Sequence, residues 1–118
     1  MTHDPRAAIL DMVQAIERAQ KLSAGFSQTD FIGSEMAQWA VFSQIVILGE
    51  AASRLDRAFQ STHPNIPWSS VIGMRHRLVH GYDSVDWARV WKTLREDLPP
   101  LLNQLKELLA VEGEGEGS

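Results

Sequence analysis

The sequence contains no cysteine, and it has no apolar stretch long enough to span a membrane. Without cysteine, neither a disulfide nor a thiolate zinc site can form. The first five residues, Met1-Thr2-His3-Asp4-Pro5, lack the basic start and apolar run of a secretory signal. These absences predict a cytoplasmic protein that has no association with a membrane.

Charge is also sparse, and the net charge of −4 argues against a nucleic-acid partner. The distribution changes this expectation. Three glutamates (Glu112, Glu114 and Glu116) lie in the tail, so removing them leaves the body near −1. Between Val71 and Arg95, five cations and two anions give a local charge of +3. We therefore expect a modest basic patch, too small for tight nonspecific binding but sufficient to guide a phosphodiester.

Apolar residues recur at helical spacing along most of the chain, which predicts an all-α fold. The expected helices cover residues 5–22, 34–60, 67–79 and 83–109, with a short turn near 31–32. The expected N-caps are Asp4, Ser34, Asn65 and either Asp83 or Ser84. The segment Leu98-Pro99-Pro100 is expected to kink or restart the last helix.

These elements predict one domain, residues 1–110, folded as a compact up-and-down bundle of four to five helices. Residues 111–118 repeat Glu and Gly and are predicted to be disordered. The middle of the second helix, Val41–Ala51, is apolar on nearly every face. A helix of this kind is central in its fold or shared with a partner subunit, which predicts a two-fold homodimer.

Glu50 lies inside this apolar helix and needs a partner if it is buried. An ion pair with Arg54, four residues later, is the favoured interpretation because it requires no special fold. The alternative is a carboxylate that orients Arg75. The four tryptophans fall on apolar stripes and are predicted to belong to the core: Trp39, Trp68, Trp87 and Trp91.

Two arginines, two histidines and the one tyrosine of the chain occur within residues 75–82. Arginine holds a phosphate and histidine can move a proton near neutral pH, so the combination suits phosphate chemistry. Arg75 and His80 are about 140° apart on an ideal helix. They can meet only if the backbone leaves the helix near His80, which Gly81 permits. A surface arginine and a helix-ending histidine are an equally open interpretation.

His76 and His80 have the i, i+4 spacing of two metal ligands on a helix. The cation Arg77 stands where the metalloprotease pattern requires glutamate, and no third ligand is obvious beyond Asp83. We therefore predict no metal site and no cofactor.

Several segments together resemble the HepT-like branch of the HEPN superfamily, over nearly the whole chain. They are Leu48-Gly49-Glu50-Ala51-Ala52, Ile66-Pro67-Trp68, Ile72-Gly73-Met74-Arg75, Leu78-Val79-His80-Gly81-Tyr82, Val85-Asp86 and Val90-Trp91. The resemblance implies a helical homodimer that cleaves RNA without metal. It also implies the toxin of a toxin–antitoxin pair, whose antitoxin is a minimal nucleotidyltransferase.

The same resemblance assigns roles to individual residues. Arg75 and His80 match the catalytic arginine and histidine, and Tyr82 matches the tyrosine that the antitoxin modifies with AMP. The family usually has asparagine where this chain has His76, which alters a polar contact or supplies a second acid–base group. Arg77 is a further candidate for pairing with the phosphate of an attached AMP.

A noncatalytic helical dimer is the competing hypothesis. Such a module would bind a nucleotidyltransferase and use its basic cleft for a nucleotide or phosphate. The arrangement of Arg75 and His80 discriminates between the two hypotheses. Side chains that converge in a cleft favour the enzyme, and side chains that diverge favour the module.

Overall fold

The computed structural model describes residues 4–117, with side chains up to Val111. The elements are α1 (Pro5–Leu22), α2 (Gln28–Ile32), α3 (Glu35–Ser53), α4 (Arg57–Thr62), α5 (Trp68–His80), the 3₁₀ turn η1 (Tyr82–Ser84), α6 (Trp87–Lys92), the π-helical turn η2 (Thr93–Asp97) and α7 (Leu98–Gly117). No strand occurs between residues 4 and 117. The all-α prediction is therefore confirmed.

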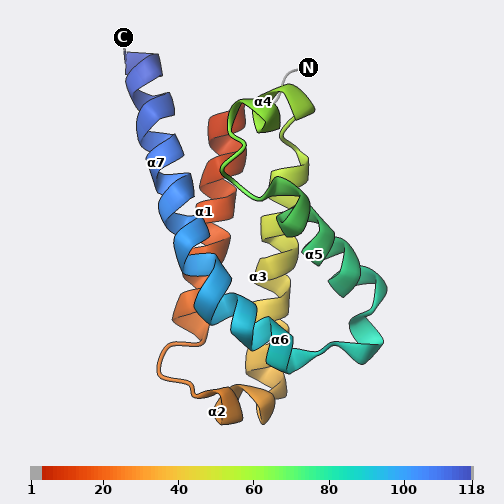
Figure 1. Cartoon of the computed structure of the whole chain (residues 1–118). Coiled ribbons are helices and arrows are strands. Elements are labelled where there is room, and N and C mark those ends of the chain that lie inside the picture. The colour runs from red at the N-terminus through yellow and green to blue at the C-terminus, as the bar shows by residue number, and fades with distance from the viewer. Residues whose placement is uncertain (1–3, 118) are drawn as a thin grey trace.

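The long helices alternate in direction, as Figure 1 shows. Helix α3 lies at the centre and packs against α1 on one side and α5 on the other. Helix α7 returns along α1, and the short α2 packs against α6 at the end where the last helical run begins. The up-and-down bundle is confirmed, with four long helical runs and the short α2 and α4 at its ends.

Helices α1 and α3 begin at the N-caps expected from the sequence. The side chains of Asp4 and Ser34 each accept a backbone N–H from the first turn of their helix, at 3.0 Å and 3.1 Å. Helix α1 ends at Leu22, as predicted. At the start of α2, the backbone N–H of Ser27 donates to the carboxylate of Asp30 at 2.9 Å, and the N–H of Asp30 donates to Oγ of Ser27 at 3.1 Å. The hydrogen bond that the carboxylate accepts from the Ser27 backbone lowers the pKa of Asp30.

The prediction of one helix over residues 34–60 was wrong, because α3 ends at Ser53 and α4 is a separate element. The carboxylate of Asp56 accepts the N–H of Phe59 at 2.8 Å and so caps a new helix. The intervening turn also inserts Leu55 into the core. A local cap and a buried side chain together outweigh continuation of the helix.

Two of the expected caps were wrong. Asn65 does not cap α5, because the first amide, that of Trp68, donates to a backbone carbonyl and no side-chain cap is present. Asp86 caps α6 instead of Asp83 or Ser84, accepting the backbone N–H three residues later at 3.1 Å. Asp83 and Ser84 belong to η1, the turn by which the chain leaves α5.

The expected disturbance at Leu98-Pro99-Pro100 is confirmed as the π-helical turn η2, which directly precedes it. The two prolines lack an N–H and their rings crowd the carbonyls four residues earlier, so a wider turn fits this position. Helix α7 then continues to Gly117. The side chains beyond Val111 and residue 118 lie outside the described part, and disorder of 111–118 stays a prediction.

The tryptophans divide into core and surface. Trp68 is buried, and the half-buried Trp87 and Trp91 pack their rings against the buried Phe31 at 6.1 Å and 5.4 Å. Trp39 is 42% exposed, so its assignment to the core was wrong. It sits on the rim of this aromatic group, 5.4 Å from the ring of Trp87.

The apolar faces of α3 are mostly covered within one chain. Val41, Ile45 and Leu48 are fully buried in the core. The uncovered part holds Met36, which is 85% exposed, with Trp39 and Ile47. None of the helices within the described residues has the length and apolarity needed to cross a membrane.

Candidate active site

Arg75 is the most constrained of the predicted site residues. Its Nη2 donates a hydrogen bond of 2.8 Å to Oε1 of Glu50, which joins α5 to α3. The Nε atom of Arg75 is buried and has no hydrogen-bond partner among the described residues. A buried donor without a partner is unfavourable. Packing against α3 and the bond to Glu50 must offset this cost, and they hold the side chain in place.

A close approach of the two helices creates this position. A Cβ built on Gly49 would lie 2.1 Å from Cβ and 2.8 Å from Cγ of Arg75. Real Cβ atoms do not come this near, so only glycine fits at this point of α3. Gly49 therefore makes the space through which the stem of Arg75 passes on its way to Glu50.

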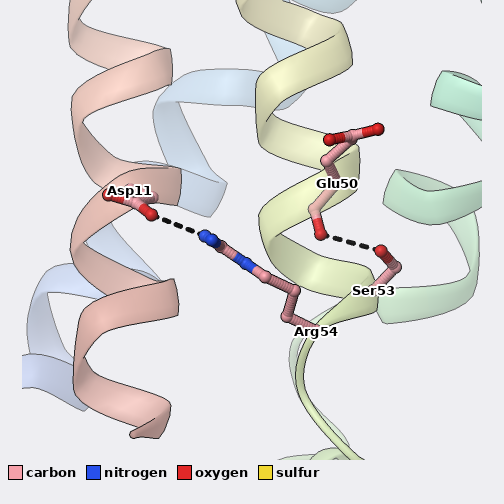
Figure 2. Close-up of polar contacts among 4 residues, drawn as sticks. All are labelled: Asp11, Glu50, Ser53 and Arg54. Carbon is pink, nitrogen blue, oxygen red and sulfur yellow. Dashed lines mark hydrogen bonds and ion pairs between the residues drawn. The ribbon is translucent and has the colours of Figure 1, made fainter. Parts of the chain in front are cut away.

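The favoured ion pair between Glu50 and Arg54 was wrong. Arg54 turns instead to the carboxylate of Asp11 on α1, as Figure 2 shows, while the carboxylate of Glu50 lies apart from it. The alternative, in which Glu50 orients Arg75, is what the structure contains. Glu50 is also not buried, since 59% of its side chain is exposed. The Glu50 carboxylate therefore contacts both Arg75 of α5 and solvent.

Arg75 and His80 do not converge within one chain. Helix α5 continues through His80 and ends only at Gly81, so the backbone does not leave the helix early. The two residues stay about 140° apart around its axis. Arg75 reaches towards α3, whereas the ring of His80 packs against His76. Of the two interpretations that the sequence left open, the one in which the pair converges at the end of the helix does not occur within a single protomer.

His76 and His80 form an exposed pair. Their ring centroids are 4.3 Å apart, with 47° between the ring planes. Among the described residues, no cluster of three or more His, Cys, Asp or Glu side chains could hold a metal ion. The two imidazoles therefore contact each other on the exposed surface of α5.

Two grooves flank α5. One, of about 970 Å³, lies between α5 and the α6–α7 run, and its lining includes Arg77, Arg89 and Asp86. The other is more open, about 1210 Å³, and runs between α4 and α5, where His76 and Arg77 meet Arg57. Arg77 therefore borders both grooves. Arg75 and His80 line neither groove.

The expected basic patch is only partly realised. Arg95 donates to the backbone carbonyls of Ser23 and Phe26 and stacks over Trp91, so it serves the structure. In the groove of about 970 Å³, Arg89 lies among carboxylates, including that of Asp86. The positive charge that stays close to the histidines comes from α4 and α5.

Tyr82 lies in η1, directly after α5, and is 63% exposed. Gly81 ends α5, with its N–H bonded to the carbonyl of Arg77 at 2.9 Å. The hydroxyl-bearing side chain is therefore presented to solvent two residues beyond His80. Its position fits a residue that another protein can reach.

The family model described as "Ribonuclease HepT-like" matches residues 12–108 of this chain. The chain belongs to the HepT-like ribonuclease family. The protein named "Probable ribonuclease HepT" from Thermococcus cleftensis is 35% identical over 98 residues, which cover 83% of this chain and 89% of that protein. The "Putative RNase" from Caldanaerobacter subterraneus subsp. tengcongensis is 32% identical over 108 residues, covering 92% and 96%. No solved structure matches this chain.

Gly49 is a residue of the candidate site that had no role assigned from its sequence context. A glycine inside an apolar helix is unfavourable and usually has a packing reason. That signal was present in Leu48-Gly49-Glu50, but its partner could not be named without the pairing of α3 and α5. The structure identifies the partner as Arg75.

Proposed function

We propose that this HepT-like chain is a metal-independent endoribonuclease that acts as the toxin of a toxin–antitoxin pair. The observation that carries the proposal is the guanidinium of Arg75, held 2.8 Å from Glu50, on the same helix that presents an exposed histidine pair, in a chain that belongs to a ribonuclease family. The proposed substrate is RNA in the cytoplasm. No cofactor takes part in the proposed chemistry.

In the proposed mechanism, Arg75 binds the scissile phosphate and stabilises the charge that develops on it. Its bond to Glu50 engages Nη2 while Nε is buried, which leaves the Nη1 end of the guanidinium for the phosphate and limits the freedom of a long side chain. A fixed donor loses less conformational entropy on binding than a mobile one. His80 transfers a proton, either from the ribose 2′-OH or to the leaving 5′-oxygen.

We further propose a two-fold homodimer that brings the reactive groups of two protomers to one cleft. Arg75 and His80 diverge on one α5, so a shared cleft requires the second protomer. The exposed apolar residues of α3, namely Met36, Trp39 and Ile47, support such an interface. Light scattering at micromolar concentration should give twice the chain mass, and a monomer at that concentration would contradict the shared cleft.

The noncatalytic module is the second candidate, and one observation favours it. Within one protomer, Arg75 and His80 do not meet, which is the arrangement expected of a binding domain. The names of the relatives, ribonuclease and RNase, favour the enzyme. Activity measurements separate the two candidates directly.

The test is RNA cleavage by purified protein in the presence of EDTA. Wild type should cleave, and folded His80→Ala should lose activity by about 10²–10⁴-fold, the usual contribution of a general acid or base. Circular dichroism checks that the variant is folded. Full cleavage by His80→Ala, or loss of wild-type activity on adding EDTA, would contradict the proposed mechanism.

We also propose that Tyr82 is the control point. The partner would be a nucleotidyltransferase antitoxin that attaches AMP to the exposed Tyr82 hydroxyl. The added phosphate could pair with the guanidinium of Arg77 or Arg75 and compete with the RNA backbone. Inhibition would then result from occlusion and negative charge, with the fold unchanged.

Incubation with ATP, magnesium and the neighbouring nucleotidyltransferase should add AMP to Tyr82 and abolish cleavage. Mass spectrometry locates the modification, and Tyr82→Phe is the matched control that keeps the ring and removes the hydroxyl. Persistent silencing of a folded, active Tyr82→Phe protein would mean that the partner inhibits by binding alone.

A further inference from the structure

The exposed face of α5 carries two imidazoles close enough to serve the same phosphodiester. His76 and His80 are one helical turn apart, and their ring centroids are 4.3 Å from each other. Both side chains are exposed, so a substrate can reach the two rings together. Two histidines with a purely structural role would instead be buried or hydrogen-bonded to neighbouring helices.

RNA cleavage by the 2′-hydroxyl requires two proton transfers. One group must accept the proton of the 2′-OH while another donates a proton to the departing 5′-oxygen. A single imidazole cannot do both in the same step, since it offers one proton state at a time. His80 therefore needs a second group within reach.

We propose that His76 is a catalytic residue and divides the two proton transfers with His80 of the same protomer, an inference that rests on the proposed function. The 2′-oxygen forms a bond to phosphorus, and the P–O5′ bond breaks. One imidazole takes the 2′-OH proton as the other gives its proton to O5′. The products are a 2′,3′-cyclic phosphate and a 5′-hydroxyl end, and solvent restores both rings.

The charges around the pair suit a phosphate. At about 100° per residue, Arg75 lies on one side of the two histidines and Arg77 on the other. Across the open groove from His76 and Arg77, α4 contributes Arg57, with the carboxylate of its N-cap, Asp56, beside it. Arg77 on α5 and Arg57 across the groove therefore lie on the side of His76, whereas the guanidinium of Arg75 is directed to Glu50 on α3.

The other ionisable groups near α5 come from α3, from η1 and from the α6–α7 run, which contributes Asp86, Arg89, Glu96 and Asp97 to the groove of about 970 Å³. Glu50 on α3 is engaged with Arg75, and Asp83 and Tyr82 follow His80 in η1. Charged groups of both signs therefore lie on the elements that neighbour α5.

The first measurement is the pH dependence of single-turnover cleavage, in EDTA, of a short RNA whose cleavage site has been mapped with the wild type. Wild type should give a bell-shaped profile, because one ring must be neutral and the other charged. His76→Gln should lose one limb of the bell and at least about 100-fold in rate. Ser69→Ala, exposed on α5 in the same groove, is the control and should behave as wild type.

The second measurement uses the same RNA with sulfur in place of the bridging 5′-oxygen. A thiolate leaves without being protonated, so this substrate needs a base but no acid. Either His76→Gln or His80→Gln, whichever removes the acid, should recover most of the lost rate, and the other should not. Recovery of one variant alone supports the division of labour and identifies the acid.

The outcomes separate the inference from the proposed function. If wild type cleaves and His76→Gln keeps the bell-shaped profile with a rate within about threefold, the second group is not His76 and the inference is wrong. Failure of the sulfur substrate to rescue either variant also overturns it. A wild type that cleaves no RNA contradicts the proposed function itself.

Discussion

The two sides of α5 differ in how far the protein constrains its functional side chains. Arg75 lies against α3, half-buried, with its guanidinium bonded to Glu50 and its stem in the space left by Gly49. His76 and His80 lie on the exposed surface and pack only against each other among the ring contacts of the described residues. One side is assembled before any substrate arrives, and the other is open to it.

This difference follows from what each group does in the proposed reaction. A phosphate-binding cation gains from being fixed, because its work is electrostatic and requires no movement. A proton-transfer group must exchange protons with both substrate and solvent, so exposure is compatible with its role. The packing of α3 against α5 is therefore the part of the fold on which the site depends most.

The largest expected effect on this packing comes from Gly49→Ala. The added Cβ would meet Cβ of Arg75 at 2.1 Å and force α3 and α5 apart. Overpacking of this kind costs about 1–3 kcal/mol of unfolding free energy. Displacing Arg75 by about 1 Å should lower the single-turnover rate roughly 10²-fold. Thermal unfolding and cleavage, measured well below the melting temperature, check the two effects.

Gly73→Ala is the matched control on α5. Its Cβ would meet only the flexible end of Arg77, at 3.4 Å. The variant should cleave like wild type, with stability unchanged or raised by up to about 1 kcal/mol because alanine is the better helix former. A folded Gly49→Ala protein with the wild-type rate would show that the close approach is not needed for activity.

A smaller effect is expected from Glu50→Gln. Glutamine can still accept the hydrogen bond from Arg75 but lacks the charge, so Arg75 is held less firmly. The rate at saturating RNA should fall roughly tenfold, about 1.4 kcal/mol in the transition state. The unfolding free energy should change by less than about 1 kcal/mol, because the carboxylate is largely exposed. Glu50→Asp, which keeps the charge, should recover part of the rate.

Arg54→Ala gives the smallest effect and tests the assignment of partners. It removes an exposed ion pair with Asp11, worth about 0–1 kcal/mol, and leaves Glu50 with Arg75. Cleavage should be unchanged. A loss as large as that of Glu50→Gln would mean that Arg54 and Glu50 act together, as the spacing along the helix first indicated.

Local sequence patterns predicted where helices begin better than they predicted which residues contact one another in the fold. Asp4, Ser34 and the double proline act through their immediate neighbours in the chain, so the α1 and α3 starts and the break before α7 could be predicted. The division at Asp56 was missed because a polar residue inside a helical pattern gives no sign of whether its cap will form. Tertiary packing decided that position by burying Leu55.

The candidate site shows the same limit. Residue types and spacing marked Arg75, His76 and His80 as candidates, and their roles stay predictions. The partner of Glu50 was chosen wrongly, since Arg54 is near in sequence whereas Arg75 is near only after α3 and α5 have packed. Whether Arg75 and His80 of one chain meet depends on where α5 ends, and local spacing does not decide that.

The most direct test of the central claim compares Arg75→Ala with Arg77→Ala. The two arginines are two residues apart on α5, but only Arg75 is held against α3. With EDTA present, single-turnover RNA cleavage should fall about 10²–10³-fold in Arg75→Ala, and less than about tenfold in Arg77→Ala, where a mobile surface cation is lost. Both variants should unfold like wild type to within about 1 kcal/mol. A folded Arg75→Ala protein that cleaves at the wild-type rate, or a greater loss in Arg77→Ala, would contradict the claim that the arginine fixed by α3 serves the reaction.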